Sequence, residues 1–230
     1  MRTIAILPVK SFAAAKQRLA GQLGAGSRQA LAQAMFSDVL SSLRHVPGLD
    51  AVVVVTADRV AEAAARGERV QVLRDTEQQG QSQAAAIGIR YALAADYHRV
   101  LLVPGDTPLL DPLEVAGLLA QRSPLAIVPD RHGTGTNALL ISPPDAIAPS
   151  FGPDSFARHV EAARAAGVEA AVERLSTLML DVDTPDDLAE LATALESRRG
   201  HAPSTRGALR QLDRSRARAS ATRAAPAPAA

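Results

Sequence analysis

Short, uninterrupted apolar runs separated by longer segments of helical periodicity constrain the fold of this chain more than any other feature. Runs such as AVVVV (51–55) and VLLV (100–103) are typical of strands covered on both faces of a largely parallel sheet. The alternation predicts one Rossmann-like α/β domain, a mostly parallel sheet with helices on both faces and ligands at the strands' carboxyl ends. The expected strands are 3–9, 51–56, 70–73, 99–103, 125–128, 138–142 and 177–182.

The segments between these strands have the spacing of amphipathic helices. In segment 27–46, leucine, methionine and valine recur every four residues, which places them on one helical face. The final helix has the clearest start, with Thr184 as N-cap, Pro185 in the first position and Asp187 in the third. Helices are expected at 27–46, 81–95, 112–121, 153–166 and 185–197.

The net charge of +1 hides two regions of opposite charge. Residues 198–230 contain eight arginines and one aspartate, a balance of +7, so the first 197 residues carry −6. A mildly acidic body does not suit a nucleic-acid-binding domain. After residue 200, alanine, arginine, proline and serine dominate without an apolar period. We therefore expect a folded domain at 1–199 and a disordered basic tail at 200–230, with a short helix at 208–218 as the alternative.

The absence of cysteine excludes disulfides, thiolate zinc sites, iron–sulfur clusters and cysteine nucleophiles. No apolar stretch approaches the roughly 20 residues that a membrane helix needs. The first apolar run is also too short for a signal peptide, because Pro8 and Lys10 interrupt it. These features predict a cytoplasmic protein without a membrane or nucleic-acid partner.

A basic loop follows the first expected strand. Lys10, Lys16 and Arg18 lie within it, and such cations form strong charge-assisted bonds with phosphate oxygens. The loop is neither a GxxxxGK[ST] phosphate loop nor a glycine-rich dinucleotide fingerprint. We interpret it as a triphosphate cradle, the alternative being a solvated basic loop.

Three aspartates have the positions expected of a divalent-metal site. Asp106 lies at the tip of the apolar strand 99–103, after Pro104 and Gly105. Asp181 and Asp183 alternate on a segment expected to be extended, so both face the same side. Mg²⁺ prefers one or two carboxylates together with phosphate oxygens and water. A turn or helix cap is the alternative for Asp106.

Two polar regions could bind a small anionic acid. Thr136 lies in the hydroxyl-rich loop 133–137, while Gly152 and Ser155 precede an expected helix whose free N–H groups suit an anion. Gly80 and Ser82, at another helix start, are candidate contacts for a nucleotide base and ribose. Each region alone could be an ordinary turn. The histidines lack metal-ligand spacing, and no GxSxG element is present.

Five motifs in order carry a family resemblance: PVKSFAAAKQRLA, PGDTPLL, DRHGTGTNALL, FGPDSFARH and DVDTPDDL. From Ile4 to Leu195 the chain resembles the guanylyltransferases that activate a three-carbon phospho-acid in biosynthesis of the deazaflavin coenzyme F(420). These are distant relatives of the molybdenum-cofactor nucleotidyltransferases. The tail lies outside this resemblance.

The resemblance implies a Mg²⁺-dependent nucleotidyltransferase that moves GMP from GTP to a phospho-acid and releases pyrophosphate. The acceptor stays open among 3-phospho-D-glycerate, phosphoenolpyruvate and 2-phospho-L-lactate, although the polar loops favour phosphoglycerate. A homodimer and hand-off of the product to the next transferase of the pathway are further expectations. By motif, Lys10, Lys16 and Arg18 would contact triphosphate, Asp106, Asp181 and Asp183 would hold Mg²⁺, and Thr136, Gly152 and Ser155 would bind the acceptor.

Two other function classes fit parts of the sequence. The Asp181/Asp183 pair matches the Asp-x-Asp of nucleotide-sugar glycosyltransferases, although there the motif lies mid-chain and here it closes the body. A non-catalytic nucleotide-binding domain is the second alternative, which retention of all three aspartates disfavours.

Overall fold

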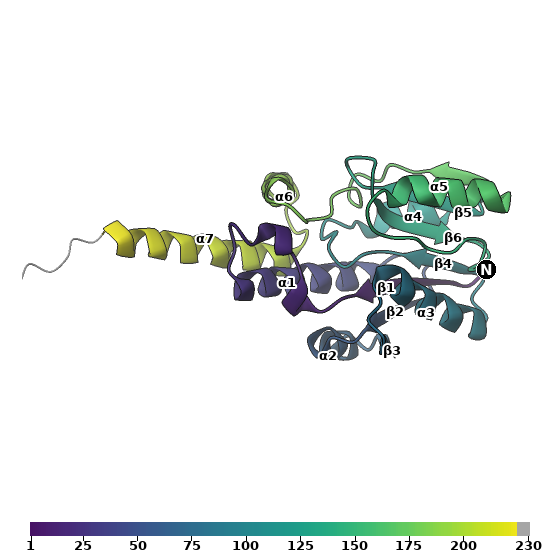
Figure 1. Cartoon of the computed structure of the whole chain (residues 1–230), viewed down its shortest axis with the longest axis horizontal. Coiled ribbons are helices and arrows are strands. Elements are labelled where there is room, and N and C mark those ends of the chain that lie inside the picture. Colours follow the sequence, from purple (N-terminus) through teal and green to yellow (C-terminus); the bar gives the residue numbers. More distant parts are fainter. Residues whose placement is uncertain (225–230) are drawn as a thin grey trace, which may run out of the picture.

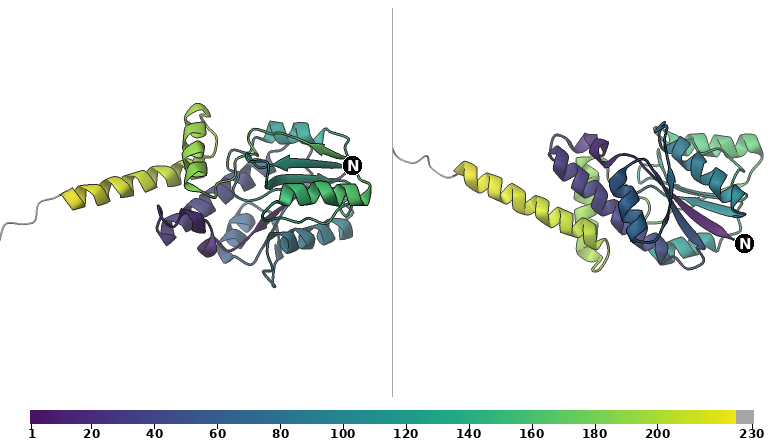
Figure 2. Two further views of the ribbon diagram at one scale, coloured as in Figure 1. Left: turned by 45° about the horizontal axis from the view of Figure 1, so that its top comes forward. Right: turned by 90° about the horizontal axis from the view of Figure 1, so that it is seen from below.

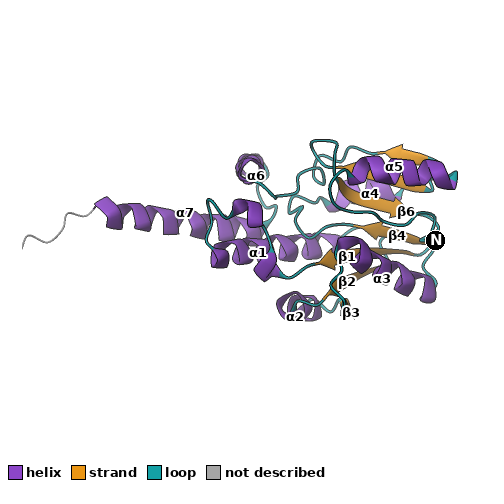
Figure 3. Cartoon of the chain, in the orientation of Figure 1, coloured by secondary structure: helices purple, strands orange, loops and turns teal. Residues whose placement is uncertain are grey.

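A seven-stranded sheet with the order β3-β2-β1-β4-β6-β5-β7 organises the computed structural model, which describes residues 1–224 (Figure 3). Only β6 runs antiparallel to its neighbours, β4 and β5. The chain moves outward from β1 to β3 and then returns with β4 to the other side of β1, which creates a switch point between β1 and β4. The strands are β1 (Thr3–Val9), β2 (Ala51–Thr56), β3 (Gln71–Arg74), β4 (Arg99–Leu102), β5 (Leu125–Pro129), β6 (Thr136–Ile141) and β7 (Ala170–Val172).

Helices cover both faces of this sheet (Figures 1 and 2). The α-helices are α1 (Ala25–Arg44), α2 (Arg59–Gly67), α3 (Gln81–Ala94), α4 (Pro112–Leu119), α5 (Ser155–Ala166), α6 (Pro185–Ser197) and α7 (Pro203–Ala224). Buried side chains of α1, α2 and α4 pack on one face, and those of α3 and α5 pack on the other. Two 3₁₀ turns, η1 (Phe12–Ala14) and η2 (Gln17–Leu19), shape the loop after β1.

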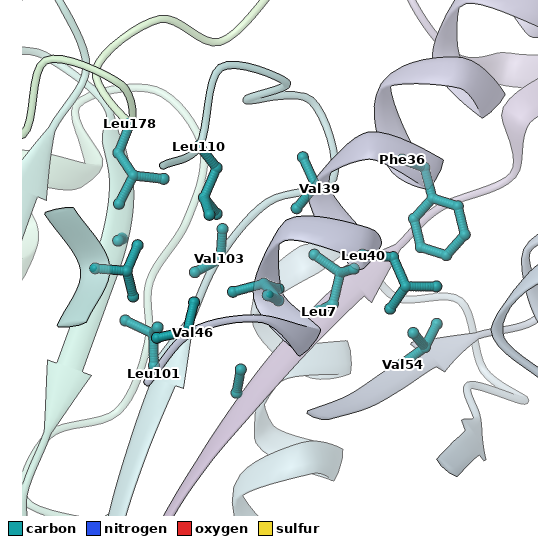
Figure 4. Close-up of a cluster of buried hydrophobic side chains, with 14 of the residues drawn as sticks. Leu7, Phe36, Val39, Leu40, Val46, Val54, Leu101, Val103, Leu110 and Leu178 are labelled. Atoms are coloured by element: carbon teal, nitrogen blue, oxygen red, sulfur yellow. The ribbon is translucent and has the colours of Figure 1, made fainter. Parts of the chain in front are cut away.

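The central strands β1, β2 and β4 are mostly apolar because each contributes to two cores. Leu7 of β1 faces the α1 side, where it packs with Phe36 and Val39 (Figure 4). Ile6, the preceding residue, faces the α3 side. Gly88 permits close packing of α3 on β1, since a Cβ there would lie 2.3 Å from Ile6 Cγ2. The α/β sheet with helices on both faces is thus confirmed.

Six of the seven expected strands are present, with ends that differ by no more than two residues. The strand expected at 177–182 is wrong. Its apolar residues alternate but do not pair along a strand. Leu178 packs in the core between the sheet and α1, whereas Leu180 and Val182 pack in a cluster with η2, α1 and α6. The seventh strand is instead β7, a three-residue edge strand beside β5. Helix α2, which the sequence analysis lacks, begins at the N-cap Asp58.

The disorder expected from residue 200 is wrong for Pro203–Ala224, which form α7. Its first turn is anchored by the buried Asp38 of α1, whose carboxylate accepts hydrogen bonds from Ser204 N at 3.0 Å and Thr205 N at 2.7 Å. Leu212 is buried in a cluster that α7 shares with η2, α1 and α6. Beyond these contacts α7 projects away from the sheet (Figures 1 and 2). The expectation for residues 225–230 lies outside the described residues.

None of the helices in residues 1–224 combines the length and apolar character needed to cross a bilayer.

Candidate active site

Two adjacent clefts open where β1 and β4 end, at the switch point of the sheet. The first cleft, of about 330 Å³, has Lys10 and Lys16 in its wall. The second cleft, of about 470 Å³, is lined among others by Arg18, Thr136, Gly152, Ser155 and Asp181. Four residues line both clefts and therefore form their boundary: Gln81, Pro104, Asp106 and Asp183.

Lys16, in the first cleft, bridges the two aspartates of the boundary. Its Nζ is 2.5 Å from Asp106 Oδ2 and 2.9 Å from Asp183 Oδ1, so the two carboxylates lie close together despite their separation in sequence. Burial opposes the charge on Lys16, but Asp106 and Asp183 together raise its pKa above the usual value, so it is a cation at neutral pH. Its backbone is left-handed, with φ of 56°, a conformation that residues other than glycine adopt infrequently.

Asp181 lies in the same wall of the second cleft as Asp183. Val182, between them, is fully buried, and its N–H donates to the Asp106 carbonyl at 3.2 Å. Thus the two aspartates share a side as expected, although no strand forms here. Burial, followed by the negative charges of Asp106 and Asp183, raises the pKa of Asp181 to about 6, while a hydrogen bond from Asn137 at 3.1 Å opposes this shift.

The aspartate oxygens fit a hard divalent cation in their chemistry. Asp106 Oδ1 is buried and has no hydrogen-bond partner within residues 1–224, and carboxylate oxygen is the ligand type that Mg²⁺ prefers. No three carboxylate or imidazole groups within residues 1–224 are already arranged around a metal position, and Lys16 bridges two of the aspartates. A cation would therefore replace the Lys16 ammonium as their counter-charge.

A part of the second cleft, which we call the neutral wall, consists of Thr136, Gly152 and Ser155, although Asp130 and Asp154 also line this cleft. Thr136 Oγ1 lies 2.9 Å from Nδ1 of His159, and the Ser150 N–H donates to Nε2 of the same ring at 2.8 Å. His159 is fully buried, and this burial, with a smaller effect of Arg158, lowers its pKa to about 4. The sequence analysis missed His159, although its position four residues after Ser155 places both on one helical face.

The predicted site residues divide between these regions. Lys10 lines the first cleft and a neighbouring depression that contains Gly80, whereas Arg18 lies with the candidate acceptor residues instead of with the two lysines. Ser82 lines none of these clefts; its hydroxyl accepts a hydrogen bond from Phe151 N at 2.8 Å and so supports the neighbouring Gly152.

The helix after the aspartates begins as its sequence predicts. Thr184 and Asp187 form the reciprocal bonds of a capping box, and Pro185 occupies the first turn. Asp187 also pairs with Arg131 at 2.6 Å. This cap fixes the start of α6 and thereby where the segment with Asp181 and Asp183 ends.

Comparison with known families decides between the function classes. The model of the family described as guanylyl transferase CofC-like matches residues 3–220. The chain belongs to this family. The match extends through most of α7, so the earlier limit of the resemblance at Leu195 was too short. As a CofC-like protein it is a nucleotidyltransferase, which removes the glycosyltransferase and non-catalytic alternatives.

Relatives of this CofC-like enzyme carry names for three acceptors. Phosphoenolpyruvate guanylyltransferase of Conexibacter woesei is 49% identical over 216 residues, which cover 92% of this chain and 97% of the relative. The 2-phospho-L-lactate guanylyltransferase of Methanothermobacter thermautotrophicus is 35% identical, with coverage of 83% and 84%. The 3-phospho-D-glycerate guanylyltransferase of Colwellia psychrerythraea is 37% identical, with coverage of 84% and 92%.

Solved structures support the same fold. A protein from Desulfovibrio desulfuricans G20 superposes on 93% of this chain and 96% of its own, with a TM-score of 0.73 and 23% identity. A 4-diphosphocytidyl-2C-methyl-D-erythritol synthase covers 85% of this chain and 100% of its own, with a TM-score of 0.58 and 16% identity. At these identities the likeness concerns the fold of the CofC-like chain alone.

Proposed function

We propose that this enzyme transfers GMP from GTP to phosphoenolpyruvate and releases pyrophosphate. The observation that carries the proposal is the adjacency of the two clefts, one lined by Lys10 and Lys16 and the other by hydrogen-bond donors, with Asp106 and Asp183 at their boundary. A nucleotide in the first cleft would meet an acceptor in the second at this boundary.

The chemistry requires no nucleophile from the protein. A phosphate oxygen of the acceptor attacks the α-phosphorus of GTP, the bond from that phosphorus to the β-phosphate bridging oxygen breaks, and pyrophosphate leaves. Because the attacking oxygen is already anionic, the enzyme must align two negatively charged molecules and neutralise their charge. The cations suited to this are Lys10, Lys16 and Arg18.

Magnesium is part of the proposal. Asp106, Asp181 and Asp183 are the side chains that would hold it, and the bound ion would neutralise charge on phosphate oxygens at the boundary. Lys16, released from Asp106 and Asp183, would then be free to bind phosphate oxygens of the triphosphate.

Two arguments favour phosphoenolpyruvate over 3-phospho-D-glycerate. The sequence analysis favoured phosphoglycerate because loop 133–137 is polar, but polar groups of this loop already have hydrogen-bond partners in the protein. Asn137 donates to Leu178 O and Asp181, and Thr134 donates twice to Asp130. Few of its groups are therefore free to recognise the extra hydroxyl of phosphoglycerate. In addition, the 49% identical relative is named for phosphoenolpyruvate. The product would be the guanylylated acid that enters coenzyme F(420) biosynthesis by hand-off to a following transferase.

A matrix of substrates tests the proposal. The purified full chain is incubated with Mg²⁺, each of GTP, ATP, CTP and UTP, and each of the three phospho-acids. Pyrophosphate release and the mass of the adduct are measured, with EDTA and acid-free reactions as controls. We expect a GMP adduct with phosphoenolpyruvate as the preferred acceptor. A preference for another acid would change the acceptor, and no adduct with any acid would reject the guanylyltransferase proposal.

A further inference from the structure

We propose that His159 is a positioning residue that holds Thr136 as a hydrogen-bond donor toward the acceptor acid. The inference rests on the proposed function for the identity of the acid. It rests on geometry for the direction of each hydrogen bond, because a buried ring with two partners leaves few possible arrangements of protons.

The partner of Nε2 fixes one side of the ring. The Ser150 backbone N–H lies 2.8 Å from Nε2, and a backbone N–H can only donate. Nε2 must therefore be an unprotonated acceptor. A neutral histidine has one N–H, so the proton belongs to Nδ1, and Nδ1 donates to Thr136 Oγ1 at 2.9 Å.

The surroundings of the ring keep it neutral. His159 has no exposed surface, and burial followed by the positive charge of Arg158 lowers its pKa to about 4. An imidazolium would also place two N–H groups against each other at Ser150. The ring is therefore in the Nδ1–H form throughout the neutral pH range.

This assignment determines what Thr136 offers to the second cleft. A threonine hydroxyl has one proton, and here the Nδ1–H occupies one of its lone pairs. Among residues 1–224 the hydroxyl has no other hydrogen-bond partner. Its proton is free to point into the cleft that Thr136 lines, where it would suit a carboxylate or phosphate oxygen.

The same ring connects the three elements that carry the candidate acceptor residues. Thr136 begins β6, Ser150 lies two residues before Gly152, and His159 is one turn after the buried Ser155 on α5. The Phe151 ring packs edge-on against the imidazole, with centroids 5.3 Å apart. A buried histidine often has a purely structural role, so the test must separate positioning of Thr136 from support of the fold.

Two substitutions of His159 each retain one of the two hydrogen bonds of the ring and remove the other. His159→Gln can retain an acceptor near the position of Nε2 but offers no donor to Thr136. His159→Asn can retain a donor near the position of Nδ1 but loses the bond from Ser150. If Thr136 donation matters, His159→Gln raises the KM for phosphoenolpyruvate by on the order of 10- to 100-fold, the range of a hydrogen bond to a charged group, and leaves the KM for GTP within about twofold. His159→Asn stays much closer to wild type.

A double-variant cycle completes the test. Thr136→Val alone should raise the KM for the acceptor, and adding His159→Gln should raise it no further, because the histidine acts through the hydroxyl. Additive effects, or equal changes in the KM for GTP, would overturn the inference. If His159→Gln does not fold, His159→Asn takes its place. A folded His159→Asn variant whose KM for phosphoenolpyruvate rises as much as that of Thr136→Val would also overturn the inference.

A measurement without turnover separates this inference from the proposed function. In a two-bond ¹H–¹⁵N spectrum of the wild-type chain at pH 7, we expect His159 as the neutral Nδ1–H tautomer. An Nε2–H tautomer or an imidazolium would overturn the positioning role even in an active enzyme. Conversely, the expected tautomer in a protein that modifies no phospho-acid would leave the hydrogen-bond assignment intact and reject the proposed function.

Discussion

The boundary between the two clefts and the neutral wall of the second cleft differ in charge and in exposure to solvent. At the charged boundary, Lys16 neutralises Asp106 and Asp183, whose side chains remain 27% and 44% exposed. In the neutral wall, Thr136 and Ser155 are buried, as is His159 behind them, and the hydrogen bonds of the imidazole join neutral groups. Charged partners that face solvent can exchange for ions and phosphates, whereas buried neutral bonds keep their geometry.

This difference indicates a division of labour. Under the proposed function, the boundary would change partners when a triphosphate and a cation bind, and its ion pairs suit such an exchange. The neutral wall would recognise a small acid without rearrangement, which favours a preorganised hydrogen-bond donor. We therefore expect substitutions at the boundary to change turnover and ion binding, and substitutions in the neutral wall to change the KM for the acceptor.

The largest expected effect is at Lys16. Lys16→Ala should lower kcat by about 10²- to 10³-fold, as does removal of comparable electrostatic donors in other enzymes. Lys16→Arg should restore only part of the rate, because a planar guanidinium differs in shape and reach. Steady-state kinetics with Arg66→Ala, an exposed cation of α2, as the control would measure this. Wild-type rates for Lys16→Ala would mean that the ammonium only neutralises the aspartates.

The same Lys16→Ala variant should bind Mg²⁺ more tightly than wild type in the absence of nucleotide. Removing the ammonium leaves Asp106 and Asp183 without their counter-charge, so a divalent ion meets less competition. Titration calorimetry of the apo protein would detect the change. Opposite effects on turnover and ion affinity would separate exchange of partners from a general loss of structure.

Asp106→Asn should have the next largest effect. It keeps the shape of the side chain but removes one negative charge, so we expect weaker Mg²⁺ binding and a fall in turnover on the order of 10²-fold. The variant should fold, since it also relieves repulsion with Asp181. Circular dichroism, Mg²⁺ titration and kinetics would test this. Unchanged Mg²⁺ affinity would remove Asp106 from the metal site.

The sequence predicted the sheet well because its strands are covered on both faces. Residues 51–55 form an uninterrupted apolar run, which is typical of a strand buried on both faces, and β2 spans Ala51–Thr56. The apolar pattern was misleading at 177–182, where alternate residues pack against helices without forming a strand. It did not predict β7, which has only three residues. Helix α7 was anticipated only by the alternative helix at 208–218, because its anchor, Asp38, lies 166 residues earlier in the chain than Ser204.

The charged residues of the site were predictable and the neutral ones only in part. Lys16 and Asp106 come after β1 and β4, so the rule that ligands bind at the carboxyl ends of strands applies to them, whereas the strand expected before Asp183 does not form. The structure nevertheless brings the three side chains together. Their direct pairing was not predictable, because it depends on the backbone conformation of Lys16. His159 is one of five histidines in the sequence, and only the fold brings it to Thr136.

A further prediction concerns the pH dependence of the neutral wall. His159 has a pKa of about 4 in the folded protein against 6.5 unfolded, so its contribution to stability is complete above pH 6.5 and is lost as the pH falls toward 4. The full loss is at most about 3 kcal/mol. Urea unfolding between pH 7 and pH 4 should show a shallower decline for His159→Asn than for wild type. The exposed His45→Gln serves as the control, and equal declines in all three proteins would contradict a buried neutral ring.

The smallest effect is expected outside both walls, at Asp38. Its carboxylate accepts the N–H groups of Ser204 and Thr205 at the start of α7, in the manner of an N-cap supplied by another helix. Asp38→Ala should lower the free energy of unfolding by about 1–2 kcal/mol, the range for loss of a helix cap. Asp38→Asn, which keeps one acceptor oxygen, should lose less. Urea titration measures both, and neither KM should change. A raised KM in a fully folded Asp38→Ala variant would show instead that docking of α7 shapes the cleft through α1, and the two walls would then not be independent of the helical extension.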